Sequence, residues 1–180
     1  MEPAEGARLG DLSVLQYPGM HRYTLPQGHS SLLTAISERK NIDPGRILVS
    51  SGATAGLGAI AVSLLNPGDE VLLLSPFWPL IRGIVQIHRG VPVEVPLYDR
   101  MDDVDAVVRT LEASCTDRTV AIYVNTPNNP TGRMLNEEQA SAIADFAKRH
   151  NLWIWSDEVY EDYGFAQPHV AMMNLAPERT

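Results

Sequence analysis

Short apolar runs alternate with longer segments of helical periodicity along most of this chain. The runs are apolar over most of their length instead of alternating with polar residues, and they lie at 46–50, 70–74, 91–95, 119–124 and 152–156. Runs of this length and kind predict strands that are buried on both faces. The segments beside them predict helices at 30–40, 54–65, 79–88, 102–113 and 137–150.

Local signals support several of these boundaries. Val104, Val107, Val108 and Leu111 recur at helical spacing. Asn136 precedes a helix with Gln139 three residues later, which predicts a capping box. Ser30 is the expected N-cap of the first helix, and turn residues fill 41–45 and 66–69.

Strands that alternate with helices favour a mostly parallel sheet covered on both faces, which is a three-layer α/β/α fold. No internal repeat or low-complexity linker divides the chain. We expect an irregular N-terminal segment and junction at 1–29, followed by one domain, or a large part of one, at 30–180.

Composition limits the cellular locations and the binding partners that the chain could have. The chain has 180 residues, 44% of them hydrophobic, which is enough for one core. A net charge of -8 argues against nucleic acid or an anionic membrane as the main partner. The single cysteine, Cys115, permits no internal disulfide, and neither a long apolar span nor a signal pattern is present, so we expect a cytoplasmic protein.

Two polar segments each follow a predicted buried strand. Asn-Thr-Pro-Asn-Asn-Pro-Thr-Gly occupies 125–132, and Ser-Asp-Glu-Val-Tyr occupies 156–160. Ligand sites in open α/β sheets form at the carboxyl ends of strands, so Asn129, Asp157 and Tyr160 should share one rim. A carboxylate can hold a ring nitrogen protonated, while an amide and a phenol can donate to a ring oxygen. This trio favours a pyridine-ring cofactor.

The two segments resemble those of the class I/II aminotransferases, which are pyridoxal phosphate enzymes of fold type I. The resemblance extends from about Tyr23 to Thr180 and matches the central part of the family's large, cofactor-binding domain. It implies that Asn129 and Tyr160 contact the phenolic oxygen of the cofactor. It also implies that Asp157 pairs with the pyridine nitrogen.

Further cofactor contacts follow from the resemblance. Gly52, Ala53 and Thr54 would hold the cofactor phosphate at a helix N-terminus, although an ordinary helix cap is the alternative for this turn. The stacking aromatic would be Trp78, with Phe77 as the other candidate. Tyr23 would reach the phosphate of a neighbouring subunit, because the complete form is expected to be a homodimer.

Lysine placement affects the expected activity. The chain has two lysines, Lys40 and Lys148, each in the last turn of a predicted helix. The family places its Schiff-base lysine one strand after the Ser-Asp-Glu segment, so the resemblance implies a large-domain fragment, truncated at both ends, that lacks this lysine. The complete form would transfer an amino group between an amino acid and a 2-oxo acid. We expect the 180-residue chain to be inactive as a transaminase.

Other interpretations stay open at this point. Fold type I lyases and decarboxylases share these cofactor contacts, and a non-catalytic remnant could bind the cofactor or a full-length homologue. A nucleotide-binding domain is disfavoured because Gly52, Gly56 and Gly58 do not match the dinucleotide-binding pattern. No metal site is expected, since the histidines lack ligand spacing; they are His21, His29, His88, His150 and His169.

Overall fold

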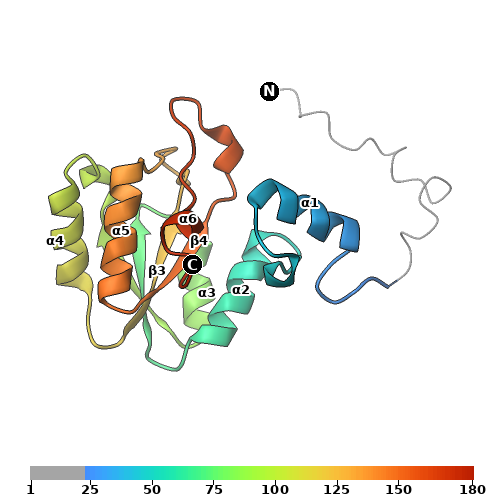
Figure 1. Cartoon of the computed structure of the whole chain (residues 1–180). Coiled ribbons are helices and arrows are strands. Elements are labelled where there is room, and N and C mark those ends of the chain that lie inside the picture. Colours follow the sequence, from blue (N-terminus) through green and yellow to red (C-terminus); the bar gives the residue numbers. More distant parts are fainter. Residues whose placement is uncertain (1–22) are drawn as a thin grey trace. The chain divides into compact units, whose positions relative to one another are not determined.

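The computed structural model describes residues 23–180 (Figure 1). The chain divides into two compact units, Met1–Ser50 and Ser51–Thr180. In the first unit, α1 (Ser30–Lys40) confirms the predicted helix, but its N-cap is His29 and not Ser30. The helix ends where Asn41 adopts a left-handed conformation with φ of 52°. The sequence-based division at residue 29 stays a prediction.

The prediction of a strand at 46–50 is wrong, because the structure has no strand there. Asp43 caps a short 3-10 helix, η2 (Pro44–Arg46), by accepting from the Gly45 N–H at 2.8 Å. The residues after it form no ladder, and the Val49 N–H instead donates to the carbonyl of Gln27 at 2.8 Å. An apolar run becomes a strand only when another strand supplies its hydrogen bonds.

Every other predicted strand and helix is present within a residue or two of its expected ends. The second unit has a four-stranded, all-parallel sheet in the order β2-β1-β3-β4, formed by β1 (Glu70–Ser75), β2 (Val91–Pro96), β3 (Thr119–Asn125) and β4 (Trp153–Asp157). Its long helices are α2 (Ala53–Leu64), α3 (Leu80–Ile87), α4 (Val104–Ser114) and α5 (Glu137–Arg149). The predicted capping box of Asn136 and Gln139 is confirmed at the start of α5.

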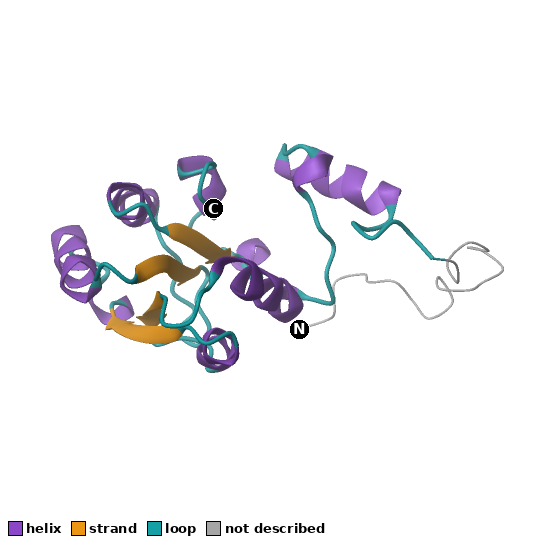
Figure 2. Cartoon of the chain, turned by 90° about the horizontal axis from the view of Figure 1, so that it is seen from below, coloured by secondary structure: helices purple, strands orange, loops and turns teal. Residues whose placement is uncertain are grey.

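Both faces of the sheet are covered, as the apolar runs predicted. On β1, Val71 and Leu73 pack with residues of α2 and α3, whereas Leu72 and Leu74 pack with residues of α4 and α5. A short helix, α6 (Met172–Leu175), joins the second of these faces. Figure 2 shows helices flanking the strands on both sides. The three-layer α/β/α architecture is therefore confirmed.

The connections create a crevice at the carboxyl edge of the sheet. The chain leaves β1 through α3 on one face, but it leaves the neighbouring strand β3 through α5 on the opposite face. Such a reversal between adjacent strands opens a space above their carboxyl ends. The sequence order of the elements thus determines where a site can form.

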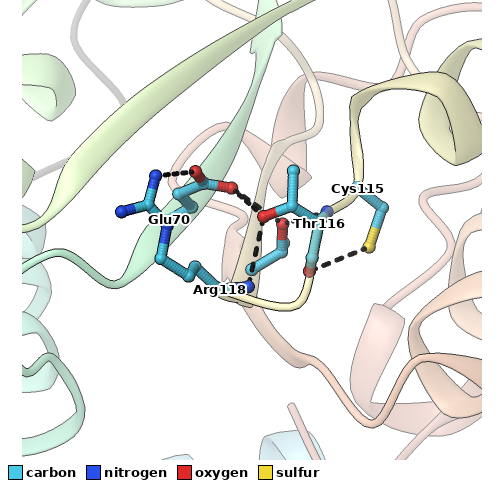
Figure 3. Close-up of polar contacts among 5 residues, drawn as sticks. Glu70, Cys115, Thr116 and Arg118 are labelled. Atoms are coloured by element: carbon cyan, nitrogen blue, oxygen red, sulfur yellow. Dashed lines mark hydrogen bonds and ion pairs between the residues drawn. The ribbon is translucent and has the colours of Figure 1, made fainter.

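A buried acid stabilises the opposite edge of the sheet. Glu70, 6% exposed at the start of β1, accepts a hydrogen bond from the hydroxyl of Thr116 (Figure 3). It also accepts one from the hydroxyl of Thr119. The Arg118 guanidinium lies 3.4 Å from the same carboxylate. These contacts hold the turn before β3 against β1. In the part of the chain described, no helix is long and apolar enough to span a membrane.

Candidate cofactor site

A cavity of about 270 Å³ lies at the carboxyl edge of the sheet in the second unit. Four segments contribute to it: the start of α2, the loop after β1, the end of β3 and the end of β4. Its lining residues are Ala53, Thr54, Leu57, Trp78, Asn125, Asn129, Asp157, Val159 and Tyr160. Most of the residues singled out from the sequence thus surround one space. Tyr23 lies in the first unit, where it is fully exposed.

The end of β3 is organised by a buried amide. Asn125, 2% exposed, accepts from the Asn129 N–H at 2.7 Å and donates to the carbonyl of Asp157 at 3.0 Å. The Thr126 N–H donates to the same carbonyl at 3.1 Å. A buried side chain that satisfies backbone groups on two segments restricts the position of both. Asn129 and Asp157 are therefore held at a defined separation.

A second buried amide joins this loop to the loop after β1. Asn128 donates to the carbonyl of Pro76 at 3.1 Å, while its oxygen accepts from the hydroxyl of Thr131 at 2.7 Å. Pro76 lies two residues before Trp78, which lines the cavity. The aromatic wall and the Asn129 wall are thus connected through Asn128.

Asp157 lies at the end of β4, and one of its carboxylate oxygens accepts a hydrogen bond from a residue of β3. The Tyr123 hydroxyl donates to Oδ2 of Asp157 at 2.7 Å, and the Val159 N–H lies 3.3 Å from Oδ1. Burial raises the pKa of the Tyr123 phenol, and the negative charge of Asp157 raises it further. The phenol therefore stays protonated and acts as a donor.

The start of α2 is suited to an anion. Gly52 precedes the helix with φ of 83°, a left-handed conformation that favours glycine, and Ala53 and Thr54 form the first turn beside the cavity. The first N–H groups of a helix have no acceptor within it, and the helix dipole favours negative charge there. This end of the cavity can receive a phosphate.

The structure separates the two candidate stacking aromatics. Trp78 lines the cavity, whereas Phe77 does not line it and instead has the Arg82 guanidinium 5.6 Å from its ring centroid. Tyr160, 39% exposed, also lines the cavity and makes an edge contact with Tyr163. An indole wall suits a flat, electron-poor ring.

Glu158, the acid next to Asp157, has structural partners instead. Its carboxylate accepts from the Ser156 hydroxyl at 2.6 Å and from the Met172 N–H at 2.9 Å, and His169 lies 3.0 Å away. It thereby joins the end of β4 to α6. Adjacent acids at a strand end consequently have different surroundings, and only Asp157 lines the cavity.

Sequence reasoning missed three residues that shape the site, namely Tyr123, Asn125 and Asn128. Asn125 and Asn128 lie inside the segment that was singled out, and their signal was a pair of amides at the end of an apolar run. Tyr123 lies within the run itself, and no pattern in the sequence distinguishes it from a core residue. Lys148 lies at the end of α5, which leads into the amino end of β4, and so at the sheet edge away from the cavity.

The fold and the cavity define an α/β protein with a polar site at the carboxyl edge of a parallel sheet. The sequence model of the family described as aminotransferase class I and II matches residues 6–179. This chain therefore belongs to the class I and II aminotransferase family, which uses pyridoxal phosphate. The predicted family resemblance is confirmed.

Individual relatives agree with this assignment. A probable aspartate/prephenate aminotransferase of Thermus aquaticus is 37% identical over 168 residues, which cover 90% of this chain and 44% of that protein. Kynurenine–oxoglutarate transaminase 3 of Mus musculus is 34% identical over 157 residues, covering 79% and 34% respectively.

Solved structures give the same result. The aspartate aminotransferase of Thermus thermophilus with maleate superposes with a TM-score of 0.83 and 34% identity, covering 93% of this chain and 45% of that one. An alanine aminotransferase from Pyrococcus furiosus gives 0.82 and 31%, covering 89% and 42%. The chain thus spans less than half the length of these relatives and corresponds to part of their fold.

Proposed function

We propose that this chain binds pyridoxal phosphate in the cavity and is the cofactor-binding part of an aminotransferase. The observation that supports this most strongly is the convergence of Asp157, Asn129, Tyr160 and Trp78 with the start of α2 on one space. Together these groups match the ring nitrogen, the phenolic oxygen, one ring face and the phosphate of the cofactor, and no other described cavity combines them. Membership in a family that uses pyridoxal phosphate supports the same ligand.

The donor set fits the cofactor chemically. The carboxylate of Asp157 would accept from a protonated ring nitrogen, since an opposite charge favours the protonated form. Asn129 and Tyr160 would donate to the phenolic oxygen, Trp78 would cover one ring face, and the turn at Gly52, Ala53 and Thr54 would bind the phosphate. When bound, the cofactor supplies an electron sink for the carbon that carries the amino group.

The reaction proposed for the complete form is transfer of an amino group between an amino acid and a 2-oxo acid. The relatives described above are named as aminotransferases, and this observation favours amino transfer over lyase or decarboxylase chemistry. The chain itself has only Lys40 and Lys148 and is proposed to be inactive alone. Tyr23 is proposed to reach the phosphate in a second copy within a homodimer, and the cytoplasmic location stays a prediction.

A titration of the chain with pyridoxal phosphate, followed by tryptophan fluorescence, tests the proposal. Trp78 lies in the cavity, so bound cofactor should quench its emission. Asp157→Asn keeps the shape but removes the charge, and it should weaken binding by about tenfold, equivalent to ~1.4 kcal/mol. Asp145→Asn is the matched control, because Asp145 is exposed on α5 and pairs only loosely with Lys148 at 3.7 Å.

Two results would contradict the proposal. A wild-type chain that is folded yet shows no saturable quenching would remove cofactor binding. Equal affinity of the wild-type, Asp157→Asn and Asp145→Asn chains would mean that binding occurs elsewhere, for example on an exposed amine.

A further inference from the structure

The floor of the cavity contains a phenol that no sequence motif includes. Tyr123 lies in the middle of β3, 1% exposed, and its ring packs in the core on the α2 and α3 side of the sheet. Its register partner on β4 is Trp155, two residues before Asp157. This placement brings the hydroxyl under the carboxylate at the strand end, where the two groups lie 2.7 Å apart.

The contact differentiates the two carboxylate oxygens of Asp157. Oδ2 accepts a hydrogen bond from the Tyr123 hydroxyl, while among residues 23–180 Oδ1 has only the Val159 N–H at 3.3 Å, a long contact. Asp157 lines the cavity and Tyr123 does not. The phenol therefore holds the carboxylate from the core side and leaves it accessible to a ligand on the cavity side.

We propose that Tyr123 is a positioning residue, which keeps the carboxylate of Asp157 oriented toward a protonated ring nitrogen. The inference rests on the proposed function, because it assigns a role to the ligand of that site. A hydrogen bond donated to a carboxylate by a buried, well-packed side chain restricts the orientations that the carboxylate samples. This restriction would strengthen pairing of Asp157 with a pyridinium and would not affect binding of a ring without nitrogen.

Two observations support a role beyond packing. The phenol is the only side-chain donor that the structure gives to the Asp157 carboxylate among the described residues. Burial raises the pKa of the Tyr123 phenol, so the phenol stays protonated near neutral pH and remains a hydrogen-bond donor. A core residue that only filled space would not need a hydroxyl at this position, and phenylalanine would serve equally well.

The test compares two ligands of the same shape. Pyridoxal phosphate has a ring nitrogen, and 1-deazapyridoxal phosphate has a C–H group in its place. The wild-type chain should prefer the pyridine form by about tenfold or more, if a charge pair forms in the cavity. Tyr123→Phe should weaken binding of pyridoxal phosphate by about fivefold, while binding of the deaza ligand changes by less than about twofold.

Suitable variants separate positioning from stability. Tyr163→Phe removes a hydroxyl from an exposed tyrosine and is the matched control. Tyr123→Met, which has no donor and a smaller volume, is the second variant, to be used if Tyr123→Phe does not fold. Thermal unfolding of each variant, measured without ligand, reports any general loss of structure.

The outcomes distinguish this inference from the proposed function. A selective loss for the pyridine ligand supports the positioning role. An equal loss for both ligands, or no loss for either, overturns it while the wild-type preference for pyridoxal phosphate leaves the proposed function intact. A wild-type chain that binds neither ligand, or that binds both equally, overturns the proposed pairing with Asp157 and this inference with it.

Discussion

The side-chain amide of Asn125 donates to the backbone carbonyl of Asp157 at 3.0 Å, across the carboxyl ends of β3 and β4. The same side chain accepts from the Asn129 N–H at 2.7 Å. Asn125 and Asp157 are also register partners in the sheet. One buried amide therefore sets the separation between the proposed ring-nitrogen partner and the proposed phenolic-oxygen partner.

Replacement of Asn125 should affect both stability and the site. Asn125→Ala leaves the Asn129 N–H and the Asp157 carbonyl without this partner, so we expect a loss of about 1–3 kcal/mol in the free energy of unfolding. Binding of pyridoxal phosphate should weaken as well, because Asn129 is released. Urea unfolding and ligand titration are the measurements. Asn174→Ala, at an exposed position of α6, is the control, and an equal effect of both changes would contradict the assignment.

Borohydride reduction should not attach pyridoxal phosphate to the chain in stoichiometric amount. Lys148 lies at the sheet edge opposite the cavity and 3.7 Å from Asp145, and Lys40 lies in the last turn of α1 in the other unit. Intact-mass measurement followed by peptide mapping detects any adduct. A one-to-one adduct on Lys148 that disappears in Asp157→Asn would show that the proposed site is wrongly placed.

The buried acid at the amino edge of the sheet should matter more than an ion pair on the surface. Glu70→Ala leaves the hydroxyls of Thr116 and Thr119 without their acceptor, at an expected cost of about 1–3 kcal/mol in unfolding free energy. Glu94→Ala breaks the Arg82–Glu94 pair of 2.7 Å, whose side chains are about half exposed, and should cost under about 1 kcal/mol. Chemical denaturation compares them, and a larger effect at Glu94 would contradict the ranking.

Alkaline pH should destabilise the second unit through its buried phenols. Burial raises the pKa of Tyr98 and of Tyr123 above the value of about 10 that they have when unfolded. The folded state thus retains protons that the unfolded state releases, so stability is intact below about pH 10 and falls as the pH rises beyond it. The slope is about 1.4 kcal/mol per pH unit for each such tyrosine.

Variants of these tyrosines test the alkaline prediction. Tyr123→Phe and Tyr98→Phe should each flatten the decline of unfolding free energy between about pH 10 and pH 11.5, because one linked proton is removed. Tyr163→Phe, at an exposed position, serves as the control. An unchanged slope in Tyr123→Phe would mean that its hydroxyl is not buried in solution as the structure places it.

The sequence alone determined most of the second unit. Runs apolar on both faces, such as 70–74, can be buried only between two helical layers, and the order of strands and helices leaves a parallel sheet as the solution. The capping box at Asn136 and the polar segments after β3 and β4 are local signals, because each depends on residues a few positions apart. For the same reason, the family resemblance and most of the lining of the cavity followed from motifs.

The tertiary structure decided what depends on partners distant in sequence. The run at 46–50 is apolar enough for a strand, yet no described strand pairs with it, so it forms none. Asp157 and Glu158 are adjacent acids, and only their surroundings separate a cavity residue from a link to α6. Tyr123 acquires its hydrogen bond from the register of β3 against β4, across 34 residues of chain. Such pairings arise from packing between strands, and local patterns carry no information about them.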